Sequence, residues 1–335
     1  MKKISFLGAG SWGTALAIML AKNGYEVTLW SKVAAEVEML STHREHMDRL
    51  PGVKLPDSIQ VTSDLEQACK EADMLVLSVA SPYVRSTAKE AAPYVKENQI
   101  IVNVGKGIED ETLLTLSDVI EQEIPQADVA VLSGPSHAEE VSHGMPTTVV
   151  VGAGTKETAE AIQEVFMNDT FRVYTSPDII GIELGGSIKN VIALAAGILD
   201  GLGLGDNTKA ALMTRGIAEV SRLGIAMGGK METFSGLSGI GDLIVTCTSN
   251  HSRNHNAGYL IGKGKTMQEA MDEVKQVVEG VYSAKAALAL AKKYDVSMPI
   301  VEAVNEVLFD DLSAQEALKL LITRDPRDEY STFQW

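Results

Sequence analysis

The chain has 335 residues, 45% of them hydrophobic and 22% charged, and a formal net charge of −16 at pH 7. This length favours two domains that share a cleft. The negative charge argues against nucleic acid or an anionic membrane as the main partner, because polyanions attract basic surfaces. No stretch reaches the ~18 uninterrupted apolar residues of a membrane span. The two cysteines, Cys69 and Cys247, suggest no disulfide framework and are compatible with a reducing cytoplasm.

From Lys2 to about Tyr174, apolar and β-branched runs alternate with helix-like segments. This rhythm is typical of a doubly wound parallel sheet. Several runs are apolar throughout, which indicates strands covered by helices on both faces. We therefore expect an α/β domain over residues 1–177, with strands at Ile4–Leu7, Val27–Trp30, Met74–Val79, Ile100–Val104, Val129–Leu132 and Thr147–Val151.

The first of these strands leads directly into a glycine-rich loop, Gly8-Ala9-Gly10-Ser11-Trp12-Gly13, and then into an apolar helix. Gly8 permits the tight turn, Gly10 lets the backbone approach a pyrophosphate, and Gly13 allows the helix to pack closely on the strand. The helix N-terminus supplies free N–H donors to the phosphates. Strand, loop and helix together predict a Rossmann-type dinucleotide site, with FAD as an alternative cofactor from the loop alone.

The second strand ends near Trp30, where an NAD-specific protein usually offers Asp or Glu to the adenosine ribose. This chain has Ser31 and Lys32 there. A hydroxyl and a cation would favour the 2′-phosphate of NADP, although Lys32 could also be an ordinary solvated residue. Use of both NAD and NADP therefore stays open.

Two loops that follow later strands carry candidate substrate residues. Lys106 follows Ile100–Val104 between two glycines, at the strand ends where open α/β sheets bind ligands. After Val129–Leu132, Ser136 and Glu139 have the spacing of a capping box, so local reasoning predicts that Ser136 caps a helix. A ligand role for Ser136 is the alternative.

Beyond Thr175 the sequence changes to long segments of Ala, Leu, Gly and Ile at helical spacing. We expect a mainly α-helical domain over residues 178–335. Its first helix should start with Ser176 as the N-cap and Pro177 in the first helical position.

Lys189 is the only charged residue between Glu183 and Asp200 and is therefore predicted to be buried. Gly185, Lys189, Ala193 and Ala196 would share one helix face of small residues. Burial lowers the pKa of a lysine, which suits it to exchange a proton with a carbonyl or an alcohol. The structural alternative is a lysine that reaches solvent or pairs with Glu183.

The helical part holds further candidates. Asp242 lies at a predicted helix start, where it could act as a first-turn acid or could orient and charge-balance Lys189. The run Ser252-Arg253-Asn254 places a guanidinium between a hydroxyl and an amide, which suits a phosphate. Cys247, His251 and His255 recur every four residues, but no fourth ligand lies nearby, so we predict no metal site.

Taken together, these segments closely resemble bacterial NAD(P)-dependent glycerol-3-phosphate dehydrogenases over nearly the whole chain. The motifs that carry the resemblance are Gly-Ala-Gly-Ser-Trp-Gly-Thr-Ala at 8–15, Gly-Lys-Gly at 105–107, Gly-Pro-Ser at 134–136, Lys189-Asn190, Gly-Ile-Gly-Asp-Leu at 239–243 and Ser-Arg-Asn at 252–254. The segment at 201–211 also looks like that of the family.

The resemblance implies reduction of dihydroxyacetone phosphate to sn-glycerol 3-phosphate in the cytoplasm, for membrane phospholipids. It implies that Lys189 exchanges the proton at C2, with Lys106 and Asp242 also catalytic. The implied substrate residues are Lys106, Gly134, Ser136, Lys189, Asp242, Ser252, Arg253 and Asn254. Besides the three loop glycines, the implied cofactor residues are Ser11, Trp12, Lys32, Lys106, Ala138, Arg253, Val277 and Glu279. Arginine is more usual at the position of Lys32, and this departure weakens the NADP preference. The sequence still favours NADPH without excluding NADH.

Two rival interpretations remain at this point. One is a two-domain dehydrogenase that acts on a 3-hydroxy acid or a ketopantoate-like substrate, which carries a carboxylate instead of a phosphate. The other is a non-catalytic dinucleotide-binding sensor, against which a buried lysine argues. We expect a small phosphorylated substrate, no nucleic acid, no integral membrane contact and a homo-oligomer, the last suggested by the long apolar helices.

Overall fold

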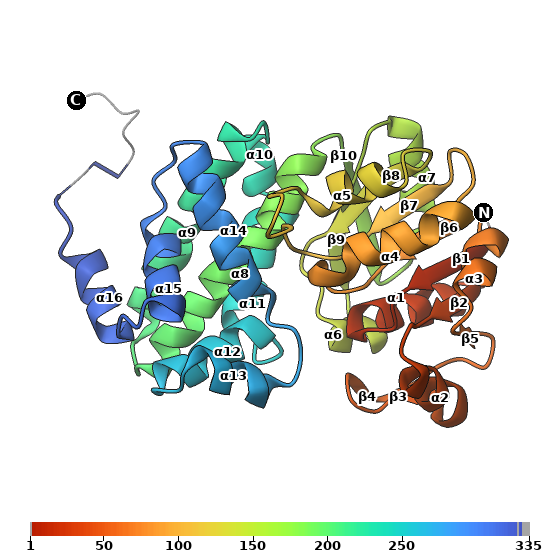
Figure 1. Cartoon of the computed structure of the whole chain (residues 1–335), viewed down its shortest axis with the longest axis horizontal. Coiled ribbons are helices and arrows are strands. Elements are labelled where there is room, and N and C mark those ends of the chain that lie inside the picture. Colours follow the sequence, from red (N-terminus) through yellow and green to blue (C-terminus); the bar gives the residue numbers. More distant parts are fainter. Residues whose placement is uncertain (1, 327, 330–335) are drawn as a thin grey trace.

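The computed structural model describes residues 2–326, 328 and 329. Figure 1 shows a part built on a β-sheet beside a part built from helices. The boundary proposed between residues 177 and 178 falls in the turn between strand β10 (Phe171–Ser176) and helix α8 (Ile179–Gly201). The outermost residues of the two predicted domains, Met1 and 330–335, lie outside the described residues.

The sheet has eight strands in the order β10-β9-β8-β7-β6-β1-β2-β5. The strands besides β10 are β1 (Lys3–Leu7), β2 (Glu26–Trp30), β5 (Gln60–Thr62), β6 (Met74–Leu77), β7 (Ile100–Asn103), β8 (Asp128–Ser133) and β9 (Thr147–Ala153). All six predicted strands are present, and the doubly wound α/β fold is confirmed. One pairing departs from a fully parallel sheet, because β8 and β9 run antiparallel. Their apolar runs look alike in sequence, since burial on both faces favours the same residues in either direction.

Both faces of the sheet are covered, which is why its strands are apolar throughout. Along β6, Met74 and Val76 belong to one hydrophobic cluster, and Leu75 and Leu77 to the cluster on the opposite face. The covering helices and turns are α1 (Ser11–Lys22), α2 (Ala34–His43), α3 (Leu65–Glu71), η1 (Ser81–Tyr83), α4 (Val84–Ala91), η2 (Ala92–Tyr94), α5 (Leu116–Glu123), α6 (Ala138–Ser142) and α7 (Lys156–Phe166). A separate hairpin, β3 (Glu45–His46) and β4 (Leu50–Lys54), lies beside α2 (Figure 1).

The helical part is organised around α8 (Figure 1). Helices α9 (Asp206–Ala226), α11 (Asp242–Thr248), α12 (Arg253–Gly262) and α14 (Glu279–Lys293) contact it. Glycines allow α12 to approach closely: a Cβ atom at Gly197 would collide with the carbonyl oxygen of His255. The remaining elements are α10 (Met231–Phe234), the π-helical turn η3 (Leu237–Gly241), α13 (Met267–Val274), α15 (Pro299–Phe309) and α16 (Ala314–Ile322).

Helix α8 starts two residues later than the sequence predicts. Its N-cap is Asp178, whose carboxylate accepts a hydrogen bond from the Gly181 amide at 3.0 Å. The Ser176 hydroxyl instead accepts from the Asp178 amide, so the prediction of a Ser176 cap is wrong. A carboxylate competes well for this position because it also interacts favourably with the positive end of the helix dipole.

By length and composition, α8 is the one helix among the described residues that could cross a membrane. Its most apolar window is 89% buried inside the protein, as in a core helix.

Candidate active site

Lys189 lies in the middle of α8 and is 4% exposed, as its apolar surroundings in the sequence predict. Its Nζ atom donates to Asp242 Oδ1 at 2.9 Å and to Thr246 Oγ1 at 2.6 Å. The Thr246 hydroxyl donates in turn to the Asp242 carbonyl oxygen, so it presents a lone pair to the lysine. Two of the three N–H directions of the ammonium group are therefore set by α11.

The surroundings of Lys189 suit proton exchange near neutral pH. Burial lowers the pKa of Lys189 to about 8; the Asp242 carboxylate opposes this shift, and the Lys106 charge adds to it. Both protonation states are therefore accessible near the pH at which most enzymes work.

Lys106, in the loop after β7, completes a three-residue charge cluster. Its Nζ atom donates to Asp242 Oδ2 at 2.6 Å, to Ser136 Oγ at 2.8 Å and to the Gly134 carbonyl oxygen at 2.9 Å. Asp242 therefore bridges the two lysines with its two oxygens. Burial alone would raise the pKa of Asp242, but the two ammonium groups lower it below its usual range. The carboxylate stays ionised between two cations.

The cluster and the glycine-rich loop line the same cleft, which has a volume of about 970 Å³. The loop backbone is shaped for close approach. Gly8 has φ +121°, and a Cβ there would lie 2.7 Å from the Val79 nitrogen, while a Cβ at Gly13 would lie 2.6 Å from the Gly8 carbonyl oxygen. Gly10 is the N-cap of α1 and uses no side chain there, so the first amides of the helix face the cleft as an anion site.

Comparison with known proteins places the chain in a family. The descriptions "NAD-dependent glycerol-3-phosphate dehydrogenase N-terminus" and "C-terminus" match residues 3–159 and 178–319. The chain belongs to the NAD-dependent glycerol-3-phosphate dehydrogenase family. A glycerol-3-phosphate dehydrogenase [NAD(P)+] of Agathobacter rectalis is 64% identical over all of both chains, and one of Bacillus subtilis is 51% identical over 98% of this chain and 96% of its own.

Solved structures agree with this membership. A glycerol-3-phosphate dehydrogenase of Coxiella burnetii superposes with a TM-score of 0.94 at 37% identity and covers 96% of this chain and 99% of its own. A ketopantoate reductase of Ralstonia eutropha shares 17% identity with a TM-score of 0.61, over 94% of this chain and 99% of its own, which shows a common fold alone. The comparisons therefore favour the family over the first rival.

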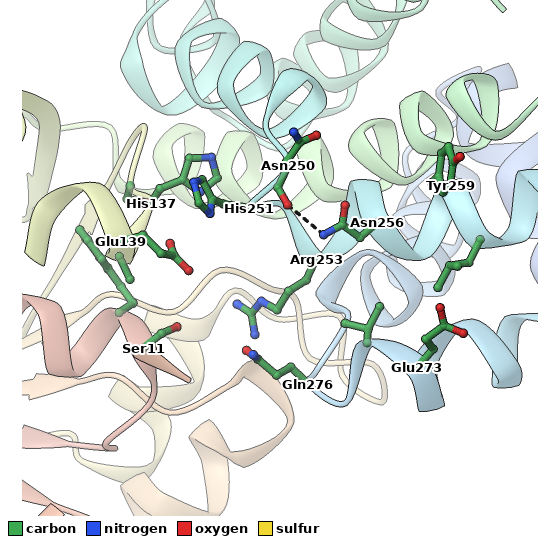
Figure 2. Close-up of a pocket in the computed structure, with 15 residues that line it drawn as sticks. Ser11, His137, Glu139, Asn250, His251, Arg253, Asn256, Tyr259, Glu273 and Gln276 are labelled. Atoms are coloured by element: carbon green, nitrogen blue, oxygen red, sulfur yellow. Dashed lines mark hydrogen bonds between the residues drawn. The ribbon is translucent and has the colours of Figure 1, made fainter. Parts of the chain in front are cut away.

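Most of the residues that the resemblance implies line the cleft. These are Gly8, Gly10, Ser11, Trp12, Lys32, Lys106, Ser136, Lys189, Asp242, Ser252, Arg253, Asn254, Val277 and Glu279. Gly13 lies beneath the loop, Gly134 contributes its carbonyl oxygen to Lys106, and Ala138 lines an adjoining pocket of about 610 Å³. Figure 2 shows this pocket, with Arg253 extending from α12 toward Gln276.

One local prediction about this region is wrong, and one structural alternative is not realised. The N-cap of α6 is His137 and makes no side-chain cap, and the Ser136 hydroxyl accepts from Lys106 instead of closing a capping box. Lys189 does not pair with Glu183, because Asp242 lies closer in space although it is more distant in sequence. In both cases a contact between distant segments replaces the contact that sequence spacing suggests.

Two of the three side chains in the predicted phosphate-binding run, Ser252-Arg253-Asn254, form hydrogen bonds within the protein. The Ser252 hydroxyl caps α12 by accepting from the His255 amide at 3.2 Å. The Asn254 side chain donates to Asn190 Oδ1 at 2.9 Å and accepts from the Gly280 amide at 2.8 Å. These bonds hold α8, α12 and α14 together and leave the Arg253 guanidinium as the cation that this segment offers to the cleft.

The three residues with a four-residue spacing, Cys247, His251 and His255, lie in different environments. Cys247 is buried, His255 Nε2 lies 2.7 Å from Asp200 Oδ2, and the His251 ring lies against that of His137. Over residues 2–326, 328 and 329, no three His, Cys, Asp or Glu side chains gather as a metal site.

Sequence reasoning missed two charged residues, Glu36 and Arg49, which line the cleft together with Ser31. Glu36, on α2, is 8% exposed; it accepts from the Ser31 hydroxyl and lies 3.0 Å from His46 Nε2 and 3.5 Å from Arg49 Nη1. Burial opposes ionisation of Glu36, but the bonds from His46 and Ser31 lower its pKa overall. No local pattern marks these residues, because His46 and Arg49 come from the hairpin.

Lys32 lines the same cleft and forms an exposed ion pair with Glu90 at 2.5 Å. The cation near the glycine-rich loop is Arg49, whose Nη1 lies 3.7 Å from the Cβ position of Gly10. The third missed residue is Thr246 beside Lys189. Its only sequence signal is the four-residue spacing from Asp242, which places both on one helix face.

Proposed function

We propose that this chain catalyses the reversible NAD(P)-dependent reduction of dihydroxyacetone phosphate to sn-glycerol 3-phosphate. The observation that carries the proposal is the buried Lys106–Asp242–Lys189 cluster at the end of a dinucleotide cleft. Its net positive charge suits a phosphorylated anion, and Lys189 supplies a proton donor whose pKa is about 8. Membership of the family gives the substrate.

The residues of the cleft fit a nicotinamide dinucleotide. The loop glycines leave room for a pyrophosphate. A Cβ atom at Gly8 or Gly13 would displace the backbone and so take away that room. We assign binding to the loop, to Trp12, Lys32, Arg253, Val277 and Glu279, and in the adjoining pocket to Ala138. When bound, the reduced cofactor supplies the hydride.

Lys189 completes the reaction at the substrate carbonyl. As hydride adds to C2, the C2–O π bond breaks and the oxygen takes a proton from Lys189 Nζ; in the oxidation, Lys189 accepts that proton. The direction of the Nζ lone pair or proton is set by Asp242 and Thr246, which hold the atom from one side. Lys106 is bound to the other carboxylate oxygen of Asp242. Its positive charge attracts the anionic substrate and polarises the substrate carbonyl.

The phosphate is assigned to Arg253, with Ser252 and Asn254 beside it. The guanidinium can bind two phosphate oxygens at once, which fixes the distance between the phosphate and C2. Holding both reactants in register supplies a large share of the catalysis. Gly134 and Ser136 contribute through Lys106, which they hold in place.

Oxidation of NADPH and of NADH by the purified chain tests the function. Turnover with dihydroxyacetone phosphate, and at least about 100-fold less with unphosphorylated dihydroxyacetone, is expected from the cation-rich site. Faster turnover with ketopantoate would establish the rival dehydrogenase. Cofactor binding without turnover of any of these ketones would establish the sensor.

Three wider statements belong to the same proposal. The product would supply phospholipid synthesis, the enzyme would act in the cytoplasm, and it would form a homo-oligomer. Sedimentation at working concentration tests the last, and a monomer would contradict it.

A further inference from the structure

Glu183 is a buried carboxyl group that the chemistry above does not use. It lies on α8, less than two turns before Lys189, and is 5% exposed. Its carboxyl group accepts from the Ser117 amide at 3.0 Å, from the Ser117 hydroxyl, and from Asn103 Nδ2 at 3.3 Å. These donors are uncharged and belong to α5 and to the end of β7, so Glu183 ties the helix of Lys189 to the sheet.

Asn103 continues this connection to Lys106. It is the last residue of β7 and is fully buried. Its Oδ1 accepts from the Gly105 amide at 3.0 Å, and its Nδ2 donates to the Gly105 carbonyl oxygen at 3.3 Å. The side chain that Glu183 holds therefore fixes the backbone immediately before Lys106.

Helix α8 supports the same loop at two further points. The Ser187 hydroxyl donates to the Gly107 carbonyl oxygen at 2.9 Å. A Cβ at Gly186 would lie 3.6 Å from Lys106 Cγ, so the lysine stem passes directly over the helix. One face of α8 thus carries Lys189 and also holds the loop of Lys106, and both ammonium groups meet at Asp242.

We propose that Glu183 is a positioning residue that, through Asn103, holds Lys106 against Asp242 and so fixes the charge that Lys189 experiences. The proposal rests on the proposed function. It assigns a role in setting proton transfer to a residue that contacts neither reactant.

The consequence is a change in the titration of Lys189. Burial is the largest cause of its lowered pKa, and the charge of Lys106 adds to it. If the loop loses this support, Lys106 moves away from Asp242 and Lys189. The repulsion from Lys106 then weakens and Asp242 pairs with Lys189 alone, and both changes raise the pKa of Lys189. The charged and titratable groups that face Lys189 are Asp242 and Cys247 of α11, Lys106, and His137 at the start of α6.

The test compares Glu183→Ala, Glu183→Gln and Asn103→Ala with the wild type. Titration of Lys189 is followed by NMR of ε-¹³C-labelled lysine, beside the pH dependence of ketone reduction. Glu183→Ala and Asn103→Ala should each raise the Lys189 midpoint by at least about half a pH unit and lower kcat/KM for dihydroxyacetone phosphate about tenfold. Glu183→Gln can accept and donate in the same places, so it should keep kcat/KM within about twofold and the Lys189 midpoint within about 0.3 pH unit.

Glu219 provides a matched control. It is also a buried glutamate of the helical part with uncharged donors, the Ile300 and Val301 amides at 3.0 and 3.4 Å, but it lies away from the cleft. Glu219→Ala should change thermal stability and leave the Lys189 midpoint in place.

An unchanged Lys189 midpoint in Glu183→Ala and Asn103→Ala would overturn the proposal and leave Glu183 a purely structural residue. If Glu183→Ala does not fold, Asn103→Ala alone decides. Because the NMR titration needs no turnover, it separates this proposal from the proposed function, whose failure would appear as an inactive wild type.

Discussion

Asp242 and Glu183 are two carboxyl groups with the same degree of burial and opposite surroundings. Asp242 lies between the ammonium groups of Lys106 and Lys189, which lower its pKa despite burial. Burial raises the pKa of Glu183, and the bonds from the neutral groups of Ser117 and Thr115 only partly offset it. Glu183 belongs to helix α8 and Asp242 contacts Lys189 of the same helix, and the two acids differ in whether the neighbouring donors carry charge.

This difference separates two roles for a buried acid. A carboxylate between two ammonium groups changes their pKa values when any of the three groups moves a short distance. This sensitivity suits a site of proton transfer. A carboxyl group among neutral donors makes directional bonds and suits a support. Burial alone therefore does not separate these two acids, whereas the charge of their partners does.

The largest expected effect comes from removing the proton donor. Lys189→Met keeps much of the side-chain volume but cannot exchange a proton, so kcat for ketone reduction should fall about 10²–10⁴-fold. Cofactor oxidation followed by absorbance measures it, and Lys292→Met, at an exposed position on α14, is the matched control. Turnover within about threefold of the wild type in a folded Lys189→Met variant would remove Lys189 from the chemistry.

Asp242→Asn tests the charged side of the comparison. Two ammonium groups would then face each other without an anion, and breaking a buried pair in this way costs about 3–5 kcal/mol. We expect a lower unfolding temperature and a reduction whose pH midpoint lies below that of the wild type, because loss of the carboxylate lowers the pKa of Lys189 further. A midpoint that moves upward would contradict the arrangement.

The pH dependence of the wild type is the next test. Ketone reduction needs Lys189 protonated, so its rate should fall as the pH rises through about 8. Oxidation of glycerol 3-phosphate needs the neutral amine, so its rate should rise through the same value. The two rates are measured as kcat/KM between pH 6 and 10, because kcat/KM reports the pKa of the free enzyme. A change in the same direction for both reactions would exclude one shared lysine.

Glu36 extends the comparison to the cofactor end, where its partners His46 and Arg49 are also cationic or titratable. Arg49→Ala should raise the Kd of NADH and NADPH alike, by about tenfold, because the guanidinium lies above the pyrophosphate loop.

Lys32→Ala should raise only the Kd of NADPH, by about threefold, since Lys32 is exposed and paired with Glu90. Fluorescence titration of the reduced cofactors measures both, and an Arg49→Ala effect confined to NADPH would move that residue to the 2′-phosphate.

Features carried by contiguous residues could be predicted from the sequence. The glycine loop needs only its own spacing and the strand before it, and the burial of Lys189 follows from a long segment with one charge. The strands on either side of Lys106 and Ser136 were also predicted. Ser136 shows where such reasoning ends, because its capping-box spacing is real but the hydroxyl accepts a hydrogen bond from Lys106, in the loop after another strand.

Local sequence patterns predicted the main strands, the dinucleotide loop and the burial of Lys189, because each depends on interactions within a few residues along the chain. Three contacts could be seen only in the folded chain: Asp242 bridges Lys106 and Lys189, Arg49 lies near Gly10, and Glu183 accepts a hydrogen bond from Asn103. Those contacts join segments that are distant along the chain. Their energies depend on distance and burial in space, which sequence spacing does not encode.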